Sequence, residues 1–246
     1  MERDVMYSRR LVVTGAGVAA GAALLGQNAW GQAQSETRER TAEAEVSAAE
    51  ELMRQHAVAG RLLLIYDKAA GPESGSAKPS AKALVSTAEM IRSNVDEHHM
   101  KLEEESVFPL FQKSGTMADL ITVLREQHTA ARGLNEVILR AAEKGESTST
   151  ESLTRDLRAY TRMLAAHTAY EETVLYPQLR TVVSPQEYER METTLREADR
   201  KKLGREGFAG LVAKVAELES TAGITGLAQF TARVGSERTA MGTPTR

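Results

Sequence analysis

The sequence contains no cysteine and few aromatic residues. The absence of cysteine excludes disulfides, thiolate nucleophiles, iron–sulfur clusters held by thiolates and zinc sites of the cysteine type. Any bound metal must therefore have nitrogen and oxygen ligands. Aromatic residues make up 4% of the chain and there are 6 prolines in 246 residues, a composition that favours helix over strand. No block of basic residues stands out and the net charge is -3, so nucleic acid is not expected as a partner.

The N-terminal segment has the features of an export signal. Arg9 and Arg10 precede an uncharged run at 11–26 that is rich in glycine and alanine, and small residues follow near Ala33. An arginine pair, a short apolar run and a small-residue cleavage site predict a signal over 1–33 of the twin-arginine type, which exports folded proteins. The run is shorter than the roughly 20 residues that span a membrane. We therefore expect an exported, periplasmic protein without a stable membrane span after cleavage.

The rest of the chain predicts an all-α protein. Four helices joined by short loops are expected at 51–68, 82–111, 116–144 and 148–176. Thr116 with Asp119, and Thr148 with Glu151, resemble helix-capping pairs. This pattern predicts an antiparallel four-helix bundle within 34–183, whose first charged stretch, 34–50, leads into the first helix.

A C-terminal extension is expected over 184–246. Ser184-Pro185-Gln186-Glu187 combines an N-cap serine, a proline at the first helical position and a glutamate at the third, which predicts a helix to about residue 202. A further helix is expected near 208–220. The bundle should thus carry one or two additional helices.

An eleven-residue pattern occurs twice in the chain. His99, Glu103, Glu104 and Phe108-Pro109 have counterparts 68 residues later in His167, Glu171, Glu172 and Tyr176-Pro177. A second, shorter pattern, Leu-x-x-Gln-His, ends at His56 and again at His128. Each half of the chain therefore consists of a helix with a single histidine followed by a helix with His-x-x-x-Glu.

The spacing within His-x-x-x-Glu has a geometric meaning. Four residues along an α-helix advance about 6 Å and about 400°, so the two side chains lie on one face and can reach one centre. This selects Glu103 and Glu171 from the two acidic clusters. Glu104 and Glu172 lie about 140° from their histidines, so they and Glu105 are expected to be solvated or to form local ion pairs.

Six side chains from four helices should converge in the core of the bundle. Six ligands suit two metals with carboxylates between them, and imidazole with carboxylate suits iron, manganese or zinc. The predicted metal ligands are His56, His99, Glu103, His128, His167 and Glu171.

Single histidines on helices are usually surface or hydrogen-bonded residues. The placement of four of the five histidines at equivalent positions of a repeat favours the metal site. The fifth, His98, is interpreted as lying behind the ligands or at the surface. Tyr170 and Tyr176 are expected in the core or beside the ligands. Four methionines are expected to be packing residues: Met53, Met90, Met100 and Met163.

These motifs resemble the hemerythrin-like HHE cation-binding family over roughly 50–180. The resemblance implies a four-helix bundle with a non-haem di-iron centre, in which the four histidines hold two iron ions and Glu103 and Glu171 bridge them. Oxygen-carrying hemerythrins place a histidine where this chain has Arg132, and an aspartate five residues after the last histidine, whereas Glu171 is at four. The ligand set is more similar to di-iron proteins of iron–sulfur repair, although the cysteine-containing domain that those proteins often carry is absent.

Several functions are compatible with this ligand set. The first is a di-iron protein of the cell envelope that binds oxygen, nitric oxide or peroxide, and the second is a reductase of such a ligand. The third is a metal-buffering or structural bundle holding zinc or manganese, and the fourth is a partner-binding bundle without metal. No hydrolytic triad, phosphate loop or dinucleotide fingerprint is present, so no catalytic residue is identified.

Overall fold

The structure is a computed structural model that describes residues 46–71, 77–145 and 150–231. These residues form helices and connecting loops with no strand, which confirms the all-α prediction. The predicted signal at 1–33, the stretch 34–45 and Thr148 lie outside the described residues. Within the described ranges, no helix combines the length and the apolar character needed to cross a membrane.

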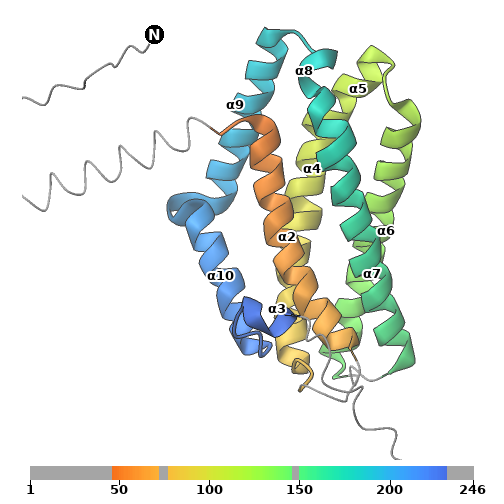
Figure 1. Ribbon diagram of the computed structural model, residues 1–246, viewed down its shortest axis with the longest axis vertical. Helices are drawn as coiled ribbons and strands as arrows, with labels where there is room; N and C mark the ends of the chain where they lie inside the picture. The colour runs from red at the N-terminus through yellow and green to blue at the C-terminus, as the bar shows by residue number, and fades with distance from the viewer. Residues whose placement is uncertain (1–45, 72–76, 146–149, 232–246) are drawn as a thin grey trace, which may run out of the picture. The chain divides into compact units, whose positions relative to one another are not determined.

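Four long helical segments form the bundle in Figure 1. The first is α2 (Ala48–Ala70) and the third is α6 (Ala118–Glu143). The second segment consists of α3 (Ala81–Ile91), η1 (Arg92–His99), α4 (Met100–Leu102), η2 (Glu103–Val107) and α5 (Phe108–Ser114). The fourth consists of α7 (Glu151–Tyr170), η3 (Glu171–Leu175), η4 (Tyr176–Gln178) and α8 (Leu179–Val182).

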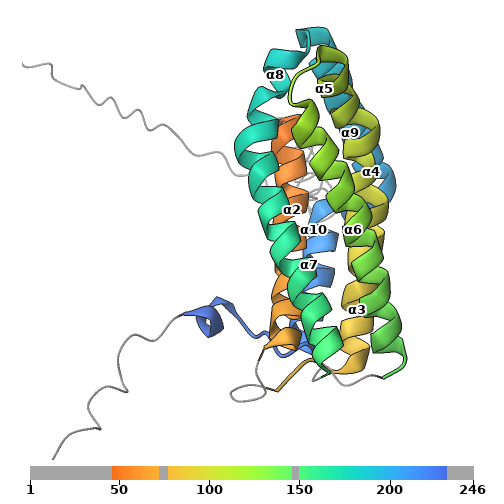
Figure 2. The ribbon, with the colours of Figure 1, turned by 90° about the vertical axis from the view of Figure 1, so that its right-hand side faces the viewer.

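Each long segment packs against the segments next to it in sequence, and the ring is closed by contact between α2 and α7. α6 contacts both α3 and α7, and all three helices can be followed in Figure 2. This is the up-down-up-down arrangement of a four-helix bundle joined by short loops. The antiparallel four-helix bundle expected from the sequence is thus the observed architecture.

Serine side chains cap several helices, and the predicted cap at Ser184 is confirmed. Ser47 forms a reciprocal capping box with Glu50 at the start of α2, and Ser184 forms one with Glu187. The predicted cap of α6 by Thr116 is wrong, because the N-cap is Met117 with φ 58° and no side-chain bond. The Thr116 amide instead donates to the Phe111 carbonyl, which closes the end of α5. The N-cap of α7 is Thr150.

The spacing argument assumed that the two His-x-x-x-Glu segments are continuous α-helices. The structure shows that they are not. η1, η2 and η3 are π-helical, and Glu103 and Glu171 are the first residues of η2 and η3. Phe108 donates its amide to the Glu103 carbonyl, and Tyr176 to the Glu171 carbonyl, five residues back. The proline that follows each aromatic residue has no amide hydrogen and clashes with the carbonyl four residues earlier, which favours this wider turn.

Two apolar clusters fill the core of the bundle at different levels. One contains residues of the C-terminal half of α2 and most of α7, such as Leu62 and Leu157. The other contains residues of the N-terminal end of α2 and of α5, such as Leu52 and Phe111. His56 of α2 and His128 of α6 are buried and lie in sequence between residues of the two clusters. The polar layer is therefore enclosed by apolar packing on both sides.

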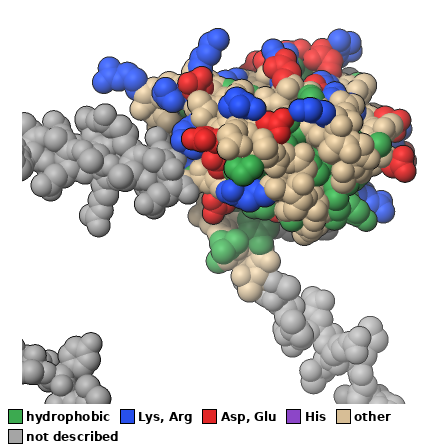
Figure 3. Space-filling view, turned by 90° about the horizontal axis from the view of Figure 1, so that it is seen from above, with side chains coloured by type: hydrophobic (Ala, Val, Ile, Leu, Met, Phe, Trp, Pro, Cys, Tyr) green, Lys and Arg blue, Asp and Glu red, His purple; other side chains and the backbone are tan. Residues whose placement is uncertain are grey.

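Two further helices, α9 (Pro185–Leu203) and α10 (Gly207–Thr221), pack beside α2 and α3. They are linked by η5 (Gly204–Glu206), and η6 (Leu227–Phe230) follows. Arg61 of α2 forms a bidentate ion pair with Glu219 of α10. On the face seen from above in Figure 3, basic and acidic side chains are interspersed, with no large patch of one sign.

Candidate metal centre

The bundle brings all six predicted ligand residues together in its core. Their exposed fractions are 4% for His56, 4% for His99, 0% for Glu103, 0% for His128, 3% for His167 and 0% for Glu171. They form two overlapping groups, each with two histidines, and Glu103 and Glu171 belong to both. Within each group the ligand atoms lie within 4.8 Å of one another, which is the geometry of two adjacent cation sites.

The imidazole Nε2 atoms face one another in pairs. The Nε2 atoms of His56 and His99 are 2.8 Å apart, and those of His128 and His167 are 3.1 Å apart. Two imidazoles bound to one metal at 2.0–2.1 Å and about a right angle would have their nitrogens about 3 Å apart. Each pair is therefore spaced to share one cation.

The two carboxylates lie between the histidine pairs. Glu103 Oε2 is 3.4 Å from the Nε2 atoms of both His99 and His128. Glu171 Oε2 is 3.3 Å from His56 Nε2 and 3.1 Å from His167 Nε2. Each glutamate thus contacts one histidine of each pair, as a bridging carboxylate must.

Glutamines orient the two histidines of the His-x-x-x-Glu motifs. His99 Nδ1 is 2.9 Å from Gln55 Oε1, and His167 Nδ1 is 2.9 Å from Gln127 Oε1. Gln55 and Gln127 are the residues before His56 and His128. Each Gln-His pair therefore supplies one clustered histidine and the acceptor that orients the histidine of the next helical segment. The repeated Leu-x-x-Gln-His motif contained this signal, but only its histidine was assigned a role.

Carboxylates orient the other two histidines, and they come from the opposite half of the chain. His56 Nδ1 is 3.0 Å from Glu172 Oε1, and His128 Nδ1 is 2.9 Å from Glu104 Oε1. The expectation that Glu104 and Glu172 are solvated or only form local ion pairs is wrong. A carboxylate behind a metal-binding histidine fixes its tautomer and increases its basicity. Glu105 does form a local, exposed ion pair, with Lys101.

This arrangement fits a metal and is difficult to explain without a cation. All four Nδ1 atoms face carbonyl or carboxylate acceptors, so Nδ1 carries the hydrogen of a neutral imidazole and Nε2 carries the lone pair. The paired Nε2 atoms therefore face each other as two acceptors. The buried atoms Glu103 Oε2, Glu171 Oε1 and Glu171 Oε2 also lack a hydrogen-bond partner. A shared cation between these donors would satisfy them all.

The pKa values follow from the same burial. Burial lowers the pKa of His56 to about 4 and the pKa values of His99 and His167 to about 3. These imidazoles are therefore neutral near pH 7, which is the form that binds metal. Burial also raises the pKa of Glu171, and the charge of Glu103 raises it further. A divalent cation would relieve this repulsion between two buried carboxylates.

Two aromatic residues contact the ligands. Tyr176 donates its hydroxyl to Glu103 Oε1 at 2.6 Å, and its ring stacks on His56. Phe108, its counterpart in the repeat, stacks on His128. Tyr176 therefore lies beside the ligands as expected, but Tyr170 is 59% exposed, so the prediction that it is in the core or beside the ligands is wrong.

Arg132 and Asp199 also join the centre, although the sequence analysis assigned neither of them a role in it. Arg132 donates to both carboxylate oxygens of Glu104, at 2.9 and 3.1 Å. It thus fixes the carboxylate that orients His128. Asp199 accepts two bonds from Gln55 and one from His98. Neither residue lies within the repeated motifs, so no local pattern indicated them. His98 lies behind His99, as interpreted, and the four methionines are buried or partly buried in the apolar clusters.

Comparison with known proteins supports this reading of the core. The "Hemerythrin HHE cation binding domain" family matches residues 47–179 and again 119–232. The second match begins in α6, where the second half of the repeat begins. The chain is 38% identical over 192 residues to "Uncharacterized protein Rv1995" of Mycobacterium tuberculosis, covering 77% of this chain and 75% of that protein. The same values hold for "Uncharacterized protein Mb2018" of Mycobacterium bovis.

No solved structure matches the chain. The family match covers more than half of the sequence, and its residues include all six clustered histidines and glutamates. This chain belongs to the hemerythrin HHE cation-binding domain family.

Proposed function

We propose that the protein is a non-haem di-iron protein that binds or reacts with a small ligand, namely oxygen, nitric oxide or peroxide, in the cell envelope. The observation that carries the proposal is the pairing of four Nε2 lone pairs around two shared carboxylates. His56 and His99 would hold one ion, and His128 and His167 the other. Glu103 and Glu171 would bridge them. Manganese or zinc could occupy the same donors, because nitrogen and oxygen ligands suit all three metals.

Iron held by imidazole and carboxylate supplies redox chemistry and open coordination positions for a small ligand. The residues of this chain supply the rest. Gln55, Gln127, Glu104 and Glu172 hold the imidazoles in one orientation. Tyr176 places a hydroxyl hydrogen beside Glu103 and His56, where it can donate a hydrogen bond within the centre.

Burial limits the size of any exogenous ligand. No side chain among the six ligands is more than 5% exposed, and two apolar clusters enclose their layer. A substrate of many atoms would have to displace core side chains, which costs several kcal/mol. Diatomic molecules and peroxide avoid this cost.

Metal content and ligand binding test the proposal. Protein purified from its own host is expected to contain about two iron atoms per chain, and nitric oxide is expected to change the absorption and paramagnetic resonance spectra of the reduced protein. A redox-inert metal in the native protein, or spectra insensitive to nitric oxide in every oxidation state, would count against it.

A metal-buffering or structural role is the second candidate. The complete enclosure of the ligands favours it, because structural metal sites are closed. In that case zinc or manganese would raise the midpoint of thermal unfolding as much as iron does, and no small ligand would bind. A role in repair of iron–sulfur clusters would instead require iron transfer to a cluster-free acceptor protein.

The envelope location rests on the sequence of residues 1–33. Replacing Arg9 and Arg10 with lysine tests it, because a twin-arginine signal requires the arginine pair. We expect the double variant to accumulate in the cytoplasm of the host, whereas the parent is found in the periplasmic fraction. If the double variant and the parent are distributed equally between cytoplasm and periplasm, the proposed location is wrong.

A further inference from the structure

Helix α9, which follows the bundle in sequence, reaches the candidate metal centre through one buried carboxylate, that of Asp199. Asp199 is 7% exposed and both of its oxygens lie 2.9 Å from Gln55 Nε2. His98 Nε2 lies 2.5 Å from Asp199 Oδ1. Burial acts to raise the pKa of Asp199, but hydrogen bonds, first that of His98, lower it below its usual range. Asp199 is therefore a carboxylate held inside the protein by donors.

Asp199 is connected to a predicted ligand by a single side chain. Because a carboxylate only accepts, Gln55 must direct its amide nitrogen to Asp199 and its carbonyl to His99 Nδ1. This fixes the hydrogen of His99 on Nδ1 and leaves Nε2 for the metal. The charge of Asp199 also polarises the Gln55 amide, which makes its carbonyl a stronger acceptor and His99 a stronger ligand.

The other half of the centre lacks this connection. Gln127 orients His167 as Gln55 orients His99, but no carboxylate bond to the Gln127 amide is found within the described residues. Ala166 occupies the position that corresponds to His98. The two histidine pairs are thus similar in their ligands and different in what lies behind them.

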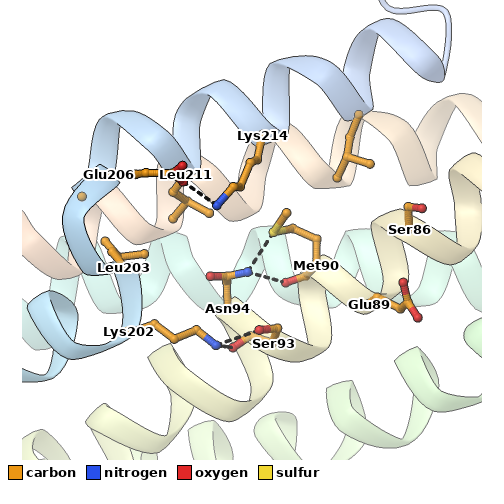
Figure 4. A pocket seen from close by; sticks show the side chains of 12 residues that line it. Ser86, Glu89, Met90, Ser93, Asn94, Lys202, Leu203, Glu206, Leu211 and Lys214 are labelled. Atoms are coloured by element: carbon orange, nitrogen blue, oxygen red, sulfur yellow. Dashed lines mark hydrogen bonds and ion pairs between the residues drawn. The ribbon is translucent and has the colours of Figure 1, made fainter.

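The C-terminal end of α9 lies beside a groove in the surface of the bundle. A groove of about 490 Å³ separates α3 and η1 from the end of α9 and from α10, and Figure 4 shows Met90, Ser93 and Asn94 facing it. Lys202 donates to Ser93 beside the groove. At Asp199 itself the contact is also apolar, because Ala198 packs against one apolar cluster and Leu203 against the other, so the hydrogen bonds of Asp199 add to apolar packing of α9 on the bundle.

We infer that α9 is part of the metal centre: Asp199 positions His99 through Gln55 and makes the ion held by His56 and His99 the more slowly released of the two. This inference rests on the metal binding of the proposed function, but not on its small-ligand chemistry. Asp199 does not contact the metal, so it is a positioning residue.

The test is release of iron to a chelator from anaerobic, fully loaded protein. The parent is expected to release two irons per chain in two phases, with Mössbauer spectra that differ between the fully loaded and half-depleted samples. Asp199→Asn keeps the shape of the side chain and removes its charge. It should accelerate the slow phase by roughly 10-fold, the lower end of the effects of residues behind metal ligands, and leave the fast phase unchanged.

Three variants serve as controls. Gln127→Ala should accelerate only the fast phase, which identifies that phase with His128 and His167. Glu192→Gln alters another contact between α9 and α2, the bond from the Ala48 amide, and should change neither phase. In a Gln55→Ala background the effect of Asp199→Asn should disappear, because the path to His99 is already broken. A role in packing alone would leave that effect intact.

The outcomes separate the two proposals. Protein that binds no iron would overturn the proposed function and this inference together. Two irons released in a single phase, or equal acceleration of both phases by Asp199→Asn, would overturn only the inference. An undiminished effect of Asp199→Asn in the Gln55→Ala background would overturn it as well.

Discussion

The two halves of the bundle, α2 to α5 and α6 to α8, can be compared residue by residue. Their ligands are equivalent: His56 with His128, His99 with His167, and Glu103 with Glu171. The acceptors of their Nδ1 atoms are equivalent as well, since Gln55 corresponds to Gln127 and Glu104 to Glu172. Around them the halves differ, because Tyr176 has Phe108 as its counterpart and Asp96 has Leu164.

The comparison shows how a repeated hairpin builds one site. Each half orients one of its own histidines with a glutamine and one histidine of the other half with a glutamate. Neither hairpin therefore has a complete set of oriented ligands alone. Only the assembled bundle satisfies all four Nδ1 atoms, so folding and completion of the centre are coupled.

The largest expected effect comes from removal of equivalent ligands. His56→Ala and His128→Ala each take one imidazole from a pair, and each should reduce iron binding from about two ions per chain to one or fewer. If the halves are equivalent, the two variants should lose similar amounts of bound iron. Elemental analysis after loading with excess iron measures this. His98→Ala, which removes the fifth histidine, is the control and should retain full stoichiometry; two tightly held irons in either ligand variant would contradict the assignment.

A smaller effect is expected from the carboxylates that cross between the halves. Glu172→Gln and Glu104→Gln remove the charge behind His56 and His128, and each should weaken iron binding by about 10- to 100-fold. The effect of Glu104→Gln should be the larger, because Glu104 is 23% exposed against 38% for Glu172, and its change also leaves Arg132 without its anion.

Competition with a chelator of known affinity measures these changes. Glu105→Gln is the matched control, since Glu105 is adjacent in sequence but 62% exposed and paired with Lys101 at 3.8 Å. It should bind iron like the parent. Parental affinity in Glu104→Gln and Glu172→Gln would show that these glutamates do not support the ligands.

The sequence identified the six clustered residues because they repeat, and missed their hydrogen-bond partners because a helical wheel treats each helix alone. Glu104 points away from the centre when seen from its own helix, yet in the bundle that direction leads to His128 on α6. Asp199 lies in a helix outside the repeat and is brought to Gln55 only by tertiary packing. The π-helical segments η2 and η3 were also missed, although Pro109 and Pro177 mark their positions.

Arg132 illustrates the same limit. The sequence showed only that an arginine stands where oxygen-carrying hemerythrins have a ligand. The structure shows that its guanidinium binds Glu104, so the residue supports the centre from outside it. Its role depends on the distance between two helices, which composition and periodicity do not contain.

Exchanging tyrosine and phenylalanine at positions 108 and 176 tests one difference between the halves, the hydroxyl that only Tyr176 supplies. Tyr176→Phe leaves Glu103 Oε1 without its donor and should lower the free energy of unfolding of the metal-free protein by about 1–3 kcal/mol. Phe108→Tyr adds the corresponding hydroxyl near Glu171, whose oxygens lack hydrogen-bond partners, and should be neutral or stabilising by up to about 1 kcal/mol. Denaturant unfolding measures both. Equal destabilisation by the two changes would mean that Phe108 and Tyr176 are not equivalent in position.

The smallest expected effect concerns Asp96, which is buried where the other half has Leu164. Burial raises the pKa of Asp96 to about 6, although Asn135 donates to it at 3.2 Å. Ionisation of Asp96 therefore destabilises the folded state. The stability contributed by its protonated carboxyl is fully present below the unfolded pKa of about 3.9 and is lost as the pH rises through the folded pKa of about 6. Asp96→Asn removes this loss and can still accept from Asn135.

The gain from Asp96→Asn should consequently depend on pH. We expect little difference from the parent at pH 4 and a stabilisation on the order of 1 kcal/mol at pH 7, less than the full shift implies because the surroundings relax around the charge. Denaturant unfolding of both metal-free proteins at the two pH values measures it, and the histidines contribute equally to both. A gain that is the same at pH 4 and pH 7 would show that it does not come from ionisation of this buried carboxyl, and the halves would then differ here in packing rather than in charge.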